Sequence, residues 1–220
     1  MGRDHSPKER QRTQLARKKA GSRASFDRIL IVTEGSQTEP NYFREICQER
    51  RIPTANVVVL PGKHGTAPLQ VVEYAERLFR EGDHQQRIEK KAFEQIYAVF
   101  DRDRHPSYQE AIRRAHTLDG TLKNDNRQAV SFAAIPSAPC FELWLLLHFE
   151  EVGAPLQPTD VLRRLQRHWP GYKKGTAHTY AHTRKRLPDA LRRAQGLHEE
   201  NPFTRIGTVV KHLSSLGLPR

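Results

Sequence analysis

Three acidic residues stand at positions from which they could act together. Glu34 directly follows an apolar run at 28–33, and Asp101 and Asp103 directly follow another at 95–100. If both runs are parallel strands, their carboxyl ends meet at one edge of a sheet, where neighbouring strands lie about 4.8 Å apart. Converging carboxylates repel one another unless a cation neutralises them, and hard oxygen ligands select Mg²⁺ or Mn²⁺. The spacing therefore predicts a divalent-metal site suited to phosphoryl-transfer chemistry.

The segments that must position these acids alternate along the chain. Short apolar runs typical of buried strands occupy 28–33, 56–60, 95–100 and 129–135. Helical patterns separate or follow them at 41–50, 66–82, 107–118 and 140–150. This alternation is typical of βαβ units, in which helices cover both faces of a mainly parallel sheet. We therefore predict an α/β, Rossmann-like core of about four parallel strands over residues 25–150.

The two ends of the chain differ from this core. Residues 1–24 contain almost no large apolar side chain, which is typical of a flexible basic arm. Beyond residue 150 no strand is evident, and helices are expected at 159–168, 176–195 and 202–216. We predict a basic α-helical extension over 151–220.

The charge distribution indicates a polyanionic partner. The chain has 220 residues and a net charge of +12. Residues 1–25 carry a net +6 and residues 151–220 a net +8, whereas 26–150 carry a net −2. A basic excess at both ends of a neutral core favours nucleic acid, DNA or RNA, as a partner, although solvated basic faces also occur for solubility alone.

The candidate nucleic-acid contacts lie either at the predicted sheet edge or in the basic extension. They are Lys63, His64, Arg102, Arg104, Tyr172, Lys173, Lys174 and Lys211. The segment 172–174 joins an aromatic side chain to two cations, a combination that suits a nucleic-acid backbone with a stacked base. An ordinary exposed basic loop is the alternative for that segment.

Two further glutamates could belong to the site. Glu142 lies in an apolar helix pattern, where an unpaired carboxylate would be costly, so it should have a metal or a basic side chain as its partner. Its alternative role is to compensate the helix dipole. Glu39 follows Glu34 by five residues at a predicted helix start, where helix capping is the alternative.

Several classes of protein are excluded by the sequence. Two cysteines cannot form a disulfide framework, and no run approaches the length of a membrane span. The basic N-terminus lacks the apolar segment of a signal peptide, so we expect a cytoplasmic protein. No P-loop or G-x-S-x-G elbow is present.

Three motifs carry a family resemblance. They are ILIVTEGSQTEPNYF at 29–43, AVFDRDRH at 98–105 and SAPCFELWLLLHF at 137–149. Strand–Glu–Gly followed later by strand–Asp-x-Asp resembles the Toprim domain of topoisomerases and primases. The closer resemblance is to the RloB-like family, which includes abortive-infection proteins of the AbiLii type, and it covers about residues 26–215.

The resemblance implies a Toprim-like fold and a role for each acid. Glu34 matches the Toprim glutamate, a candidate general acid/base or metal ligand, and Asp101 and Asp103 match the metal-binding pair. It further implies Mg²⁺-dependent phosphodiester cleavage in bacterial anti-phage defence, often beside an AAA- or ABC-type ATPase.

Two principal hypotheses follow. The first is a metal-dependent nuclease that cleaves DNA or RNA. The second is a non-catalytic module that binds nucleic acid or an ATPase partner, with an acidic site that is structural or regulatory. A Toprim enzyme that transfers a nucleotidyl or phosphoryl group is a third possibility.

Overall fold

The computed structural model describes residues 27–62, 65, 67–102, 105–197 and 200–216. The basic arm predicted for 1–24 lies outside these residues, as do four candidate site residues. Those four are Lys63, His64, Asp103 and Arg104.

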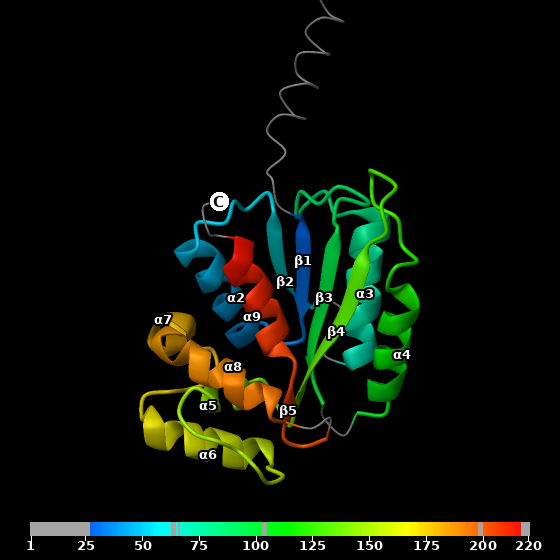
Figure 1. Cartoon of the computed structure of the whole chain (residues 1–220). Coiled ribbons are helices and arrows are strands. Elements are labelled where there is room, and N and C mark those ends of the chain that lie inside the picture. The colour runs from blue at the N-terminus through cyan, green and yellow to red at the C-terminus, as the bar shows by residue number, and fades with distance from the viewer. Residues whose placement is uncertain (1–26, 63–64, 66, 103–104, 198–199, 217–220) are drawn as a thin grey trace, which may run out of the picture.

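Within the described ranges the chain forms one five-stranded sheet in the order β2-β1-β3-β4-β5 (Figure 1). The strands are β1 (Ile29–Thr33), β2 (Val57–Pro61), β3 (Gln95–Asp101), β4 (Ser131–Ala138) and β5 (Phe203–Thr204). The first four strands pair in parallel, and β5 pairs with β4 in the antiparallel sense. The predicted α/β, Rossmann-like fold class is confirmed.

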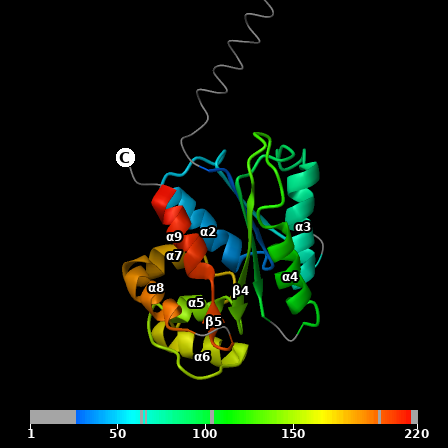
Figure 2. The same cartoon turned by 45° about the vertical axis from the view of Figure 1, so that its right-hand side comes forward.

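Helices cover both faces of this sheet. They are α2 (Thr38–Glu49), α3 (Pro68–Glu81), α4 (Tyr108–Leu118), α5 (Glu142–Leu146), α6 (Pro158–His168), α7 (Thr179–Thr183), the 3₁₀ helix η1 (Arg184–Arg186), α8 (Leu187–Gln195) and α9 (Ile206–Leu216). Figure 2 shows α3 and α4 on one side of the sheet, with α2, α9 and the remaining helices on the other. In the described part of the chain, no helix combines the length and apolar character needed to cross a membrane.

The apolar run of β1 is continuous because both of its faces are covered. Leu30 and Val32 contribute to the apolar cluster beneath α3 and α4. Ile29 and Ile31 contribute to the cluster on the opposite face. Alternation of side chains along a strand therefore divides one short segment between two cores.

The C-terminal segment shares a core with the sheet. Val161 of α6 and Val209 of α9 belong to the same buried cluster as Ile31 of β1. Trp144 of α5 is also fully buried there, and its indole N–H donates a hydrogen bond of 2.9 Å to the hydroxyl of Tyr42 on α2. The basic helices are thus held against α2 and the sheet by apolar packing.

Two predicted features of this segment were wrong. The single helix expected at 176–195 is divided into α7, η1 and α8, with Pro188 in the first turn of α8. Proline lacks a backbone N–H and disfavours a helical conformation in the preceding residue, so it belongs at a helix start. The helix expected from 202 begins only at Ile206, because 203–204 form β5, a strand too short to produce a sequence pattern.

Candidate active site

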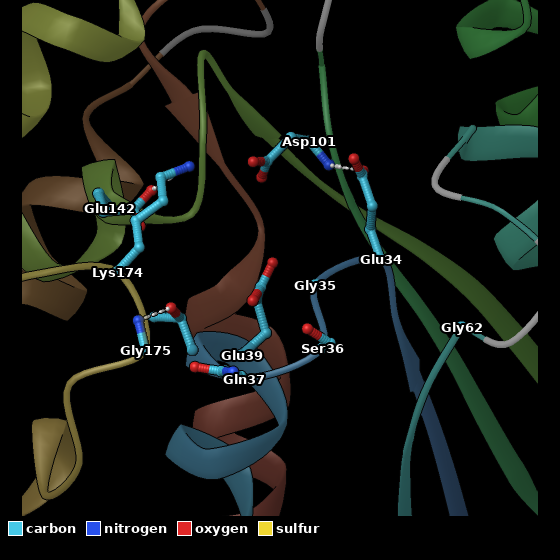
Figure 3. A pocket seen from close by; sticks show the side chains of 11 residues that line it. Glu34, Gly35, Ser36, Gln37, Glu39, Gly62, Asp101, Glu142, Lys174 and Gly175 are labelled. Carbon is cyan, nitrogen blue, oxygen red and sulfur yellow. Dashed lines mark hydrogen bonds and ion pairs between the residues drawn. The ribbon is translucent and has the colours of Figure 1, made fainter.

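A cavity of about 390 Å³ opens at the carboxyl end of the sheet (Figure 3). It is bounded by the end of β1, the start of α2, the end of β3, the start of α5 and the loop before α7. The residues that line it are Glu34, Gly35, Ser36, Gln37, Thr38, Glu39, Gly62, Asp101, Glu142, Lys174 and Gly175. Four carboxylates from three separate parts of the sequence therefore share one space.

Glu34 and Asp101 meet here because β1 and β3 are neighbouring parallel strands. The backbone N–H of Glu34 donates to the carbonyl of Val99 at 2.8 Å. In return, Oε2 of Glu34 accepts the backbone N–H of Asp101 at 2.9 Å. In Figure 3 the carboxylate of Asp101 is directed away from that of Glu34, toward Glu142 and Lys174. Glu34 thus fixes the main chain that presents Asp101 to the cavity.

Glu39 lines this cavity and is buried, with 8% of the residue exposed. Its carboxylate lies beside the backbone of Gly35, where an added Cβ would clash with the carboxylate oxygens. Burial raises the pKa of Glu39, and the charge of Glu142 raises it further, whereas Lys174 and the backbone N–H of Gly35 oppose this. A side chain at Gly35 would therefore displace the carboxylate of Glu39, and Glu39 belongs among the site acids.

Glu142 has the partners that its buried position requires, with only 2% of the residue exposed. The hydroxyl of Tyr172 donates to its Oε1 at 3.2 Å. Nζ of Lys174 lies 3.7 Å from its Oε2. Figure 3 shows Lys174 reaching across this wall of the cavity from the loop before α7.

The structure corrects the role predicted for Tyr172. We expected its ring to stack on a base, but the residue is completely buried and unavailable for stacking. Burial and the neighbouring Glu142 both raise the pKa of its hydroxyl, so it remains a hydrogen-bond donor. Tyr172 therefore supports Glu142 from behind. Lys173, the next residue along, is exposed.

The cavity carries an excess of negative charge. The pKa of Asp101 is raised well above its ordinary value, first by burial and then by the charges of Glu39, Glu34 and Glu142. Burial works against the charge of Lys174, but the carboxylates, Glu142 foremost, raise its pKa overall. Among the described residues that line the cavity, Lys174 is the cation. One ammonium facing four carboxylates makes the cavity receptive to a further cation.

The donor set has the chemistry of a hard-cation site. Carboxylate oxygens suit Mg²⁺ or Mn²⁺ better than softer metals. Within the described residues, however, no three His, Cys, Asp or Glu side chains are grouped closely enough to hold a metal. Asp103, the third acid of the predicted cluster, lies outside those residues. The chemistry of the cavity thus fits such an ion, and the described side chains alone do not complete a coordination sphere.

Among the described residues, the basic candidates Arg102, Lys173 and Lys211 do not line this cavity. Arg102 lies at the same edge of the sheet, with its guanidinium 5.2 Å from the ring centre of Tyr108 on α4. Lys211 is exposed on α9. The adjacent His212 shares a hydrogen bond of 2.8 Å with the hydroxyl of Tyr97, in the middle of β3 rather than at its end. The structure thus places Lys211 away from the acids, and its contact with nucleic acid stays a prediction.

Sequence reasoning did not find the contact that closes the cavity. The backbone N–H of Gly175 donates to Oγ1 of Thr38 at 2.8 Å, joining the loop of Lys174 to the start of α2. These two residues are 137 positions apart. No local pattern predicts a contact of this range.

Comparison with protein families identifies the chain. A model of the RloB-like protein family matches residues 29–213, which include every strand and all four acids of the cavity. The chain belongs to the RloB-like family. This confirms the resemblance inferred from the three motifs, while the Toprim assignment stays a prediction. The comparisons with curated proteins and with solved structures gave no match.

Proposed function

We propose that this RloB-like protein is a metal-dependent nuclease. The observation that carries the proposal is the cavity at the carboxyl end of the sheet, where Glu34, Glu39, Asp101 and Glu142 converge beside Lys174. In open parallel sheets, this edge is where ligands bind. Asp103, which follows Asp101 by two residues, is expected to complete the acidic set.

Each side chain has a proposed task. Asp101 and Glu39, with Asp103, would hold Mg²⁺ or Mn²⁺, and Glu34 would orient the main chain of Asp101. A bound ion would polarise the phosphate and lower the pKa of a water molecule. Lys174, held by Glu142, would contact the phosphate and stabilise the charge that develops on it.

The test is cleavage of single-stranded and duplex DNA, total RNA and tRNA with Mg²⁺ or Mn²⁺. Asp101→Asn and Glu34→Ala should each reduce the cleavage rate by about 10³-fold or more, the scale seen when central catalytic groups are removed. Asp160→Asn is the matched control, because this carboxylate lies on α6 and pairs with the exposed Arg163. Cleavage that survives in both site variants would contradict the proposal.

A second function is favoured by a specific observation. The acids of the described residues are largely engaged by the protein, since Glu34 accepts a backbone N–H and Glu142 is paired with Tyr172 and Lys174. That arrangement also suits a non-catalytic module that binds nucleic acid or an ATPase. Binding of nucleic acid without cleavage under any metal condition, alone or with an ATPase, would favour this function.

The biological setting is part of the same proposal. We place the activity in bacterial phage defence, with an AAA- or ABC-type ATPase that would keep the nuclease inactive until it is needed. Cleavage that the purified chain performs only when the ATPase and ATP are added would support it. Equal cleavage with and without the ATPase would remove the partner from the proposal.

A further inference from the structure

A second pocket lies at the same edge of the sheet but on its opposite face. It has a volume of about 160 Å³ and lies between the end of β4, β5 and the start of α4. Arg102 and Arg205 line it, together with Tyr108 and Phe203. At about 30 Å³ per water molecule, it has room for a phosphate group.

The strand register explains why two arginines meet there. Asp101 is paired with Ser137 on β4, and the backbone N–H of Arg102 donates to the carbonyl of Ser137 at 2.6 Å. On the other side of β4, Ser137 is paired with Thr204, and the backbone N–H of Arg205 donates to the carbonyl of Pro136 at 3.0 Å. Both arginines therefore flank the same strand end.

The alternation of side chains places the arginines opposite the acids. Asp101, Ser137 and Thr204 share one face, as the hydrogen bond of 2.9 Å between the two hydroxyls requires. Arg102 and Arg205 are each the next residue along and project from the other face. One edge of the sheet therefore presents carboxylates on one side and guanidinium groups on the other.

Aromatic rings support both guanidinium groups. The guanidinium carbon of Arg102 lies 5.2 Å from the ring centre of Tyr108, and that of Arg205 lies 5.7 Å from the ring centre of Phe203. Such contacts hold the plane of a guanidinium group against an aromatic ring. Paired guanidinium groups of this kind match the oxygens of a phosphate.

We propose that this pocket binds a phosphate of the nucleic-acid strand, adjacent to the phosphodiester placed at the carboxylate cavity. The inference takes its substrate, nucleic acid, from the proposed function. It adds the path that the strand follows over the protein. The strand crosses the carboxyl edge of the sheet from Arg205 and Arg102, past Asp101, to Lys174. Cations at the two ends of this path flank the acids.

The test measures binding rather than cleavage. Full-length wild type, Arg205→Gln and Arg102→Gln are titrated against fluorescent single-stranded DNA and RNA of 20 nucleotides in EDTA, at several salt concentrations. Each substitution should weaken binding roughly tenfold or more, because a charge-assisted hydrogen bond is lost. Each should also reduce the salt slope by about 0.7, the value for one phosphate on a single strand.

Arg163→Gln is the matched control, since it removes the same charge from an exposed site on α6, where Arg163 pairs with Asp160 at 2.7 Å. Its binding should stay close to that of wild type. Equal losses in all three variants, or no loss in the pocket variants, would overturn the subsite. Arg205→Lys, which keeps the charge, should recover part of the affinity, and a melting curve identifies a variant that fails to fold.

The result separates this inference from the proposed function. A wild-type chain that binds neither strand overturns the substrate class and the subsite together. Wild-type binding that Arg205→Gln leaves unchanged overturns the subsite alone. Inorganic phosphate should compete with the labelled strand for binding to the wild type but not for binding to Arg205→Gln. That result would support the phosphate chemistry of the pocket.

Discussion

Carboxylates lie at both ends of the parallel sheet, but in opposite electrostatic surroundings. At the amino end, Arg28 precedes β1 and binds two carboxylates, with Nε 3.1 Å from Oε2 of Glu94 and Nη1 2.8 Å from Oδ2 of Asp125. Glu94 also accepts the side-chain N–H of Asn124 at 3.0 Å. At the carboxyl end, four acids share a cavity with Lys174.

The pKa values report this contrast. Burial alone would raise the pKa of Glu94, but hydrogen bonds from the side chain and backbone of Arg28 lower it overall. The pKa of Asp101 is raised well above the ordinary range, because burial and three neighbouring carboxylates act in the same direction. Charge is therefore balanced where the sheet only has to be held together, and left unbalanced where a ligand is expected.

The largest change in stability should come from breaking the balanced end. Arg28→Ala leaves Glu94 and Asp125 without their cation, and the side chain of Glu94 is only 20% exposed. A buried pair broken in this way costs 3–5 kcal/mol, and partial exposure reduces the expected loss to about 2 kcal/mol. Urea denaturation measures it. An effect no larger than that of Arg163→Ala, which breaks an exposed pair, would contradict this account.

Glu94→Gln should destabilise the protein by about 1 kcal/mol, since it keeps the shape but removes the charge that Arg28 binds. The folded pKa of Glu94 is lowered, so its contribution to stability is present above the ordinary value of 4.5 and is lost as the pH falls through the folded pKa. The difference between variant and wild type should therefore shrink in acid. Urea titrations between pH 7 and pH 3 measure this trend, and a constant difference would refute it.

Asp101→Asn should have the opposite effect on stability to Glu94→Gln and stabilise the metal-free protein by about 1 kcal/mol. The folded pKa of Asp101 is raised, so the cost of its charge develops as the pH rises from 3.8 through the folded pKa. The gain should be largest at high pH and vanish near pH 3.8. Melting curves in EDTA compare the stability change of Asp101→Asn with that of Glu94→Gln. If both substitutions changed the stability in the same direction, the contrast between the two ends of the sheet would be contradicted.

The smallest effect, a change in the pKa of Asp101, should follow from Glu39→Gln. This change removes one of the charges that raise the pKa of Asp101, so that pKa should fall. NMR titration of the side-chain carbons of Asp101 measures it directly. Glu45→Gln is the control, because the carboxylate of Glu45 accepts the backbone N–H of Tyr180 at 2.9 Å and is not among the residues that line the cavity. Equal shifts in both variants would show that Glu39 has no specific influence.

The central strands and the first pair of acids could be predicted from local pattern. Runs such as ILIVT are short, apolar and followed by an acidic residue or Pro, so each strand could be located without knowledge of its neighbours. Parallel connections then place the ends of β1 and β3 at one edge, which brings Glu34 to Asp101. The buried position of Glu142 likewise required a partner, which Tyr172 and Lys174 supply.

The roles of Tyr172 and Arg205 could not be predicted in this way. Tyr172 stands in a basic segment that is polar by composition, and only the packing of that loop against α5 buries its ring. Arg205 reaches its pocket because two residues pair with the end of β4, and two residues carry no periodicity. Both outcomes depend on contacts between segments more than 25 positions apart.

The amino-acid sequence by itself determined the order of the four parallel strands, the α/β class and the edge of the sheet at which the acids gather. These follow from periodicity and topology, which act over a few residues or through the handedness of the chain. Only the tertiary structure decided which acids are buried together, that Lys174 faces them, and that guanidinium groups occupy the opposite face. Those features depend on how residues 151–216 pack against the sheet, and packing energy is shared among side chains that no local pattern connects.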